Sequence, residues 1–235
     1  MTAASFQSTV NINYAFGVIG ELIVDGPQRA DSLTLDSSGG TIGNAFTKNN
    51  VTDIASQGGA IGSGAIFAGI LVNPKVYALR GVSSSPLDPS LTLPGNAQGA
   101  FLTMGTIVVT ITGAANIGDQ VVYDTTTGAL SAVAQEASFT GVQAAGVLTV
   151  SAITRGSIGV GSIIKSAGAI IGKVISLGTG TGGNGTYNLD TSATVSSTTM
   201  TANSQPATGK GFVPNAVVWQ YPTSASGLVA IRLTN

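Results

Sequence analysis

Short runs that alternate apolar with polar residues recur along this chain, and many end in glycine, proline, aspartate or asparagine. A period of two is typical of β-strands with one buried face, and the closing residues are typical of turns. "SFQSTVNINYAFG", residues 5–17, is an example. No window shows the 3.6-residue apolar period or the capping box that would predict a helix. The pattern predicts an all-β protein, built around a small β-barrel or β-sandwich domain.

One glycine-rich stretch raises the question of phosphate binding. "ISLGTGTGGNGTYNLDTS", residues 175–192, has five glycines between Gly178 and Gly185. A phosphate-binding loop needs a helix after its glycines, but the residues that follow favour a strand. "AGAIIGKV", residues 167–174, approaches a Walker A loop, yet Val174 stands where a magnesium-binding Ser or Thr is required. We therefore expect a hairpin turn, near the tip of an inserted β module.

Composition excludes several kinds of chemistry. Only 8% of the 235 residues are charged and the net charge is −1, without a run of Lys or Arg that would attract nucleic acid. A surface with so little charge is expected to be partly covered in its working state. The absence of Cys and His excludes disulfides, thiolate chemistry, His-dependent nucleophiles and nearly all common zinc sites. We predict no cofactor and no metal.

Targeting signals are also missing. The first residues lack the basic and continuous apolar regions of a secretory signal, and no apolar run reaches the ~20 residues of a membrane span. "VGSIIKSAGAIIGKVISL" comes nearest, but Lys165 and Lys173 interrupt it. We expect a protein made in the cytoplasm, without a membrane partner.

Residues 1–16 are expected to form an extended arm. Their apolar residues share one parity, which suits a segment that adds to a sheet edge of this chain or of a neighbour. The alternative for each is packing on its own core. The arm residues proposed as contacts are Phe6, Val10, Ile12, Tyr14 and Phe16.

The middle of the chain differs in style from its flanks. Residues 138–201 have their own strand–turn rhythm, whereas "VVYDTTTGALSA" and "AVVWQYPTSASGLVAIRL" resemble each other more than either resembles the middle. We predict a discontinuous domain, residues 1–136 plus 204–235, with residues 138–201 inserted as a second β module. Trp219 and Tyr221 are expected to share a face of the last strand pair, as core or as a subunit interface.

Several of these segments resemble a known family. "IGDQVVYDTTTGALSA", "FVPNAVVWQYPTSASGLVAIRLTN" and "GELIVDGPQRADSLTLDSS" are similar to segments of the structural cement, or capsid decoration, proteins of tailed bacteriophages. The inserted residues, with "GVGSIIKSAGAIIGKVISLGTGTGGNGTY", are similar to a β module of phage virion and fibre proteins. The resemblance covers about residues 1–136 and 204–235 for the first family, and its motifs are structural.

The resemblance implies a role without catalysis. A cement protein is expected to form a homodimer or homotrimer on the outer surface of the expanded capsid, within the virion. It would bridge neighbouring major capsid protein subunits and resist the pressure of packaged DNA. The arm residues, with Trp219 and Tyr221, are the candidate capsid or subunit contacts, and the inserted module is expected to project outward.

Two other functions remain open. The module would bind a host receptor or a surface glycan if it were a fibre-like domain, and its only aromatics and carboxylate are Phe139, Tyr187 and Asp190. An enzyme such as a depolymerase needs two carboxylates flanking a bond, but most candidates lie in turn signals. Asp119 and Asp124 suggest either a cation site or turn stabilisation. We predict that the protein is not an enzyme.

Overall fold

The computed structural model describes residues 17–62, 64–74 and 91–234. Every regular element in these ranges is a strand, so the predicted all-β class is confirmed. No helix in the described ranges is long and apolar enough to cross a membrane. The five arm positions proposed as contacts, Phe6, Val10, Ile12, Tyr14 and Phe16, lie outside the described residues.

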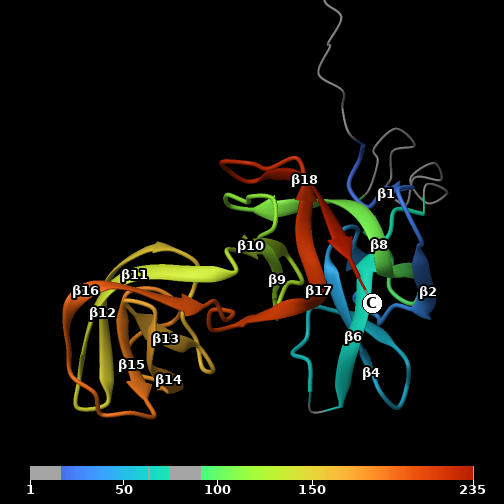
Figure 1. The fold of residues 1–235 in the computed structure, drawn as a ribbon. Coiled ribbons are helices and arrows are strands. Elements are labelled where there is room, and N and C mark those ends of the chain that lie inside the picture. Colours follow the sequence, from blue (N-terminus) through green and yellow to red (C-terminus); the bar gives the residue numbers. More distant parts are fainter. Residues whose placement is uncertain (1–16, 63, 75–90, 235) are drawn as a thin grey trace, which may run out of the picture.

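Five strands close into a ring in the larger part of the molecule, which we call the body (Figure 1). Around the ring, each strand pairs with the next, and a short parallel pairing of the first and last strands, Leu130 with Ile111, completes it. Apolar side chains from all five strands fill the interior. The strands are β8 (Gln98–Thr112), β10 (Leu130–Val133), β9 (Gln120–Asp124), β17 (Lys210–Gln220) and β18 (Gly227–Leu233).

Strand β8 belongs to a second group of strands as well. Its first half pairs with β2 (Arg29–Thr34) and β6 (Ala65–Leu71), and its second half pairs with β18. Gly105, with a φ of 128°, lies where one set of partners gives way to the other. A glycine is suited to this bend because it adopts positive φ without strain.

The second group has its own core. It continues from β6 to β4 (Ala45–Asn49) and then to β5 (Ala55–Gln57). A parallel bridge joins Ala55 of β5 to Leu35, the residue that follows β2. Phe46 and Phe101 pack edge to face inside it, with ring centroids 5.1 Å apart. Three short strands complete the body: β1 (Leu22–Ile23), β3 (Gly40–Thr41) and β7 (Thr92–Leu93).

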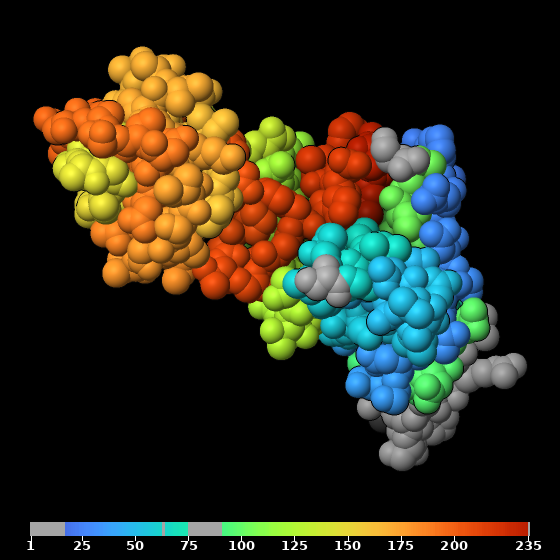
Figure 2. Space-filling view, turned by 90° about the horizontal axis from the view of Figure 1, so that it is seen from below, coloured from blue at the N-terminus to red at the C-terminus, as the bar shows by residue number. Residues whose placement is uncertain are grey.

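A second, closed barrel lies between β10 and β17 in the sequence. Its inward residues alternate with outward ones along the first strand, where Ala137, Phe139 and Gly141 are buried. Its core cluster contains no residue of the body's clusters. Figures 1 and 2 show this barrel at one end of the molecule and the body at the other. The strands are β11 (Glu136–Ala144), β12 (Val147–Arg155), β13 (Ile163–Ser166), β14 (Ala169–Leu177), β15 (Gly185–Leu189) and β16 (Val195–Asn203).

Candidate interaction surfaces

The glycine-rich stretch joins β14 to β15, so the predicted turn between two strands is confirmed. The N–H groups at the start of the stretch, from Gly178 to Gly180, are used within the hairpin, which leaves them unavailable to a phosphate group. Gly178 N–H and Gly180 N–H both donate to the carbonyl oxygen of Thr186, at 2.9 and 3.2 Å. Thr179 N–H donates to the Thr186 hydroxyl at 2.9 Å. These residues do not form a nucleotide site.

The expected position of this loop, near the tip of the inserted module, is wrong. The loop lies against the segment that returns the chain to the body, because Thr208 N–H donates to the Thr181 carbonyl oxygen at 3.2 Å. Ala207 packs on Gly182, where an added Cβ atom would lie 2.7 Å from the Cβ of Ala207. The glycine therefore leaves room for the returning chain. The contact joins residues that are distant along the chain, so no local sequence pattern predicts it.

The aromatic residues of the barrel do not form a sugar-binding platform. The side chains of Phe139 and Tyr187 are 1% and 0% exposed, and both belong to the barrel core. Asp190 accepts a hydrogen bond from the Lys173 N–H at 2.7 Å, which fixes the adjacent backbone. A carbohydrate site usually presents an open aromatic face, and residues 138–201 contain no other aromatic side chain.

Asp119 and Asp124 stabilise two separate turns. Asp119 accepts a hydrogen bond from the Asn116 N–H at 2.8 Å. Asp124 accepts from the N–H groups of Thr127 and Thr126, at 2.8 and 2.9 Å, and these bonds lower the pKa of its carboxyl group. The two carboxylates flank the ends of β9, roughly 16 Å apart at ~3.3 Å per residue. They cannot ligate one cation, so the turn interpretation holds.

Trp219 lies on the surface of the body, in contact with an ion pair. Its side chain is 39% exposed, and the guanidinium carbon of Arg232 lies 3.6 Å from the centroid of its ring. Arg232 also pairs with Asp25, and its Nε donates to the Thr106 hydroxyl at 3.3 Å. The hydroxyl of Thr106, followed by the guanidinium of Arg232, lowers the pKa of Asp25. We call Trp219, Arg232 and Asp25 the tryptophan cluster.

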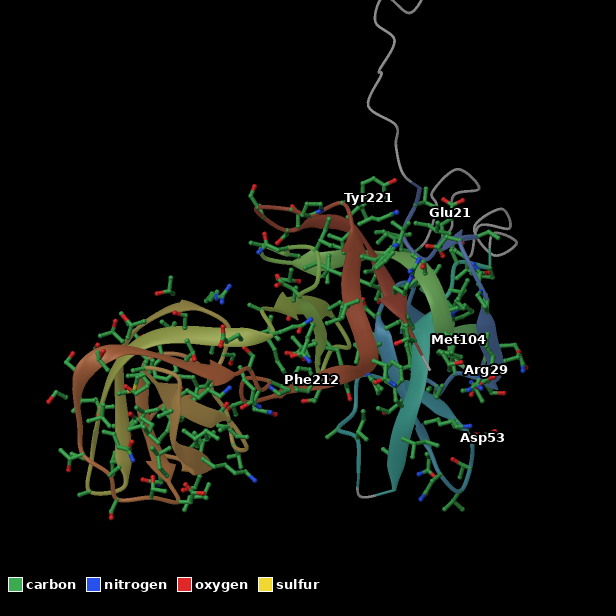
Figure 3. The ribbon with its side chains drawn as sticks, viewed as in Figure 1. Glu21, Arg29, Asp53, Met104, Phe212 and Tyr221 are labelled. Carbon is green, nitrogen blue, oxygen red and sulfur yellow. The ribbon has the colours of Figure 1, made fainter. Side chains whose placement is uncertain are left out.

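The core interpretation of Trp219 and Tyr221 is wrong. Tyr221 is 42% exposed and lies beyond the end of β17, at the edge of the body (Figure 3). A register shift between Val218 and Gln220 interrupts β17 at Trp219, and Tyr221 has a φ of 61°. The regular alternation that would give the two rings one face therefore ends at this point. Sequence reasoning also missed Arg232 and Asp25, which are separated from each other by most of the chain.

A further exposed surface covers the outer side of the hairpin β13–β14. Cross-strand pairing places Ile163 opposite Lys173 and Lys165 opposite Ile170, and all four side chains are exposed. Neither lysine makes an ion pair with any residue that the structure describes. Ile175 is 56% exposed farther along β14. Aliphatic and cationic groups thus alternate here, on a barrel whose other outer strands are rich in Ser and Thr.

Comparison with known proteins gives two findings. The sequence matches the family model described as "Structural cement protein (E217 gp24/Pam3 gp6)" over residues 6–159, which is more than half of the chain. A solved structure described as "The capsid of Myoviridae Phage XM1" contains a similar chain, with 13% identity, 98% of each chain covered and a TM-score of 0.47. No curated protein matches.

Proposed function

Since this chain belongs to the phage structural cement protein family, we propose that it binds the outer surface of the expanded phage head and links neighbouring major capsid protein subunits. The links stabilise the shell against the pressure of packaged DNA. The family match across residues 6–159 is the observation that carries this proposal. The function requires contact area and no catalysis.

The body is the part that anchors the protein in this proposal. The family match includes nearly all of the body before the barrel, from residue 6 to β10, and continues through β11 and β12 of the barrel to residue 159. Arm residues Phe6, Val10, Ile12, Tyr14 and Phe16 contact a capsid subunit or a neighbouring copy through strand addition. Low overall charge favours such contacts, because few charged groups lose their hydration when the surface is covered.

The tryptophan cluster is the proposed contact on the described surface of the body. Trp and Arg are the side chains that most often dominate binding energy at protein interfaces. Arg232 holds the ring of Trp219 from one side and is itself fixed by Asp25, so little side-chain freedom is lost when a partner covers the ring. Tyr221 extends the same proposal to the end of β17. The partner is the major capsid protein or a second copy in a homodimer or homotrimer.

The barrel projects outward from the capsid in this proposal. Its core is independent of the body's clusters, so it needs no support from the shell. An inserted unit of this kind is tolerated best where it disturbs no interface. In this proposal the body, residues 1–136 plus 204–235, binds the capsid, and the module, residues 138–201, is displayed on its outside.

A second function for the displayed module is favoured by the outer face of β13–β14. Exposed Ile163, Ile170 and Ile175 lie beside two lysines that pair with no described carboxylate, and together they suit an acidic receptor with apolar groups. Weak contacts of this type gain strength when many copies are displayed on one particle. Host attachment through this surface would involve an acidic, partly apolar partner. A glycan is a poorer partner, since the barrel's aromatic rings are buried.

The test is co-sedimentation of the purified protein with expanded capsids that have been stripped of it, followed by cryo-electron microscopy. Density for the body at repeated local symmetry positions on the outer surface is the expected result. Absence of binding, or density restricted to a tail or a single vertex, would overturn the cement function. The same maps would report whether the barrel points away from the shell.

A further inference from the structure

The chain passes between the body and the barrel twice, and both connecting segments are short. We call these the first crossing, residues 134–135, and the second crossing, residues 204–209. Figure 1 shows both, where β10 leads to β11 and where β16 leads to β17. The structure of these two crossings is independent of the cement function.

Gln135 ties the first crossing both to the body and to the second crossing. The Gln135 side chain donates from Nε2 to the Gly118 carbonyl oxygen of the body at 2.9 Å. Its own carbonyl oxygen accepts from the Ser204 N–H at 2.9 Å, which ties the first crossing to the second. Glu136, the next residue, already belongs to β11 of the barrel. Only one residue, Ala134, separates Gln135 from β10.

The second crossing changes partner between two consecutive residues. Gln205 N–H donates to the Ser157 carbonyl oxygen at 3.1 Å, and Thr208 N–H donates to that of Thr181 at 3.2 Å. Both acceptors belong to barrel loops. Gly209 follows Thr208 in the chain, and its carbonyl oxygen accepts from the backbone N–H of Thr125 in the body at 2.9 Å. A single residue step therefore joins a barrel contact to a body contact.

Two glycines of the barrel loops pack directly against residues of the second crossing. A Cβ atom on Gly182 would lie 2.7 Å from the Cβ of Ala207 and 2.8 Å from the Ser157 hydroxyl. A Cβ atom on Gly159 would lie 2.9 Å from the Cβ of Gln205. Real Cβ atoms do not approach neighbours so closely, so any side chain at either position would displace the crossing.

We propose that the glycine-rich loop is one half of a rigid joint, which holds the barrel at a single orientation on the body. Flexible linkers between domains have free residues that rotate independently. Here the hydrogen bonds of both crossings, the bond between them and the contact of Ala207 with Gly182 leave only Ala134 and Pro206 of these described residues without such a contact, and the ring of Pro206 fixes its own φ. The glycines serve close packing at the joint, and the molecule behaves as one body in solution.

The test is a distance distribution between two spin labels, one on each part. The chain contains no cysteine, so Val51→Cys and Ile170→Cys place the labels without other changes. These side chains are 86% and 68% exposed, in the body and on the barrel respectively. Pulsed electron paramagnetic resonance on the full-length protein then reports the width of the distribution, which measures motion between the two parts.

Two variants act on the joint, and one neighbouring variant serves as control. Gly182→Ala adds the clashing Cβ atom at a residue with a φ of 129°. Ala207→Leu enlarges the opposite side of the contact and leaves the loop backbone unstrained. Gly183→Ala is the matched control, because its Cβ atom would meet only Ile153 Cγ2, at 4.0 Å.

We expect a narrow, single distribution for the unmodified joint and for Gly183→Ala, and a distribution at least about twofold broader for Ala207→Leu and Gly182→Ala. Circular dichroism of each variant reports whether the barrel remains folded. If Gly182→Ala unfolds the barrel, Ala207→Leu alone decides. The joint is refuted if the parent distribution is already as broad as that of Ala207→Leu, or if a folded Ala207→Leu leaves it unchanged.

Discussion

Gly180 lies directly on the ring of Tyr187, so closely that a Cβ atom at this glycine would be 2.3 Å from Cζ of the ring. The hydroxyl group of the same tyrosine accepts from the Gly182 N–H at 3.2 Å and donates to the Gly183 carbonyl oxygen at 2.6 Å. The glycine-rich loop is thus folded over a buried phenol that satisfies its backbone groups. This arrangement explains why the stretch resembles a phosphate-binding loop in composition and differs from one in structure.

Tyr187→Phe should loosen the loop without a change in packing volume. The buried Gly182 N–H loses its acceptor, which costs about 1–2 kcal/mol in the free energy of local opening. Amide hydrogen exchange in residues 178–187 should then be about tenfold faster. Tyr123→Phe is the matched control, because it removes a hydroxyl that donates to the Gly59 carbonyl oxygen at 2.8 Å in the body. Unchanged exchange in the Tyr187→Phe loop would contradict this role of the phenol.

Asp124 should contribute stability only in its charged form. Its folded-state pKa lies below the usual value of 3.8, chiefly because the Thr127 N–H donates to the carboxylate. Such a group stabilises the fold at pH values above 3.8, and the contribution is lost as the pH falls through the folded-state pKa. Asp124→Asn should therefore lower Tm at about pH 6, and its effect should shrink as the pH falls through the folded-state pKa. Thermal unfolding across this range measures the difference, and a pH-independent difference would argue against charge as the cause.

Trp219→Ala should weaken binding to stripped, expanded capsids or to a second copy. A central interface tryptophan contributes about 2 kcal/mol or more, which corresponds to roughly thirtyfold in Kd. The ring is partly exposed, so its removal should cost the free chain little stability. Ile175→Ala on the barrel is the control, since it removes exposed apolar surface away from the proposed anchor. Wild-type affinity in both the capsid assay and the self-association assay would remove Trp219 from the interface.

Deletion of the barrel should leave an anchoring body that still binds capsids. Gln135 and Ser204 are hydrogen-bonded to each other at 2.9 Å, so a short Gly–Ser bridge can replace residues 136–203. The cores of the body contain no barrel residue and should stay intact. Co-sedimentation of the shortened protein, after its fold has been checked by circular dichroism, measures the outcome. A folded body that no longer binds would show that the barrel is part of the anchor.

Local patterns were sufficient to predict the class of fold and several hairpins. The turn from Asp124 to Gly128 was predictable because an Asp that accepts from the N–H groups two and three residues further on, and a glycine with positive φ, are local features. The alternation along β11 that buries Phe139 is likewise a local feature. The apolar run around Glu21 forms only the two-residue strand Leu22–Ile23, because the Glu21 N–H closes a turn on the Val18 carbonyl oxygen at 3.0 Å, although the Glu21 carbonyl oxygen still accepts from the Val108 N–H of β8 at 2.9 Å.

Features that depend on distant segments could not be predicted. The position of Gly182 follows from its contact with Ala207, and the exposure of Trp219 follows from a register shift between two strands. Arg232 carries no local sign that Trp219 and Asp25 will surround it. These features are decided by pairing between strands, whereas a single strand's pattern records only which of its own faces is buried.

The long strand β8 also constrains the order in which the chain folds during synthesis. Ile107 pairs with Ile231, so the ring of the body stays open until the final strand has left the ribosome. The barrel needs only pairings between Glu136 and Asn203, and all of its strands are made before β17 begins. Long-range pairing is slower than local pairing. The inserted barrel is therefore expected to fold before the two sequence segments of the body pair with each other. The nascent chain thus carries a finished domain within an unfinished one, and the unpaired edge of β8 is the segment most in need of protection from aggregation.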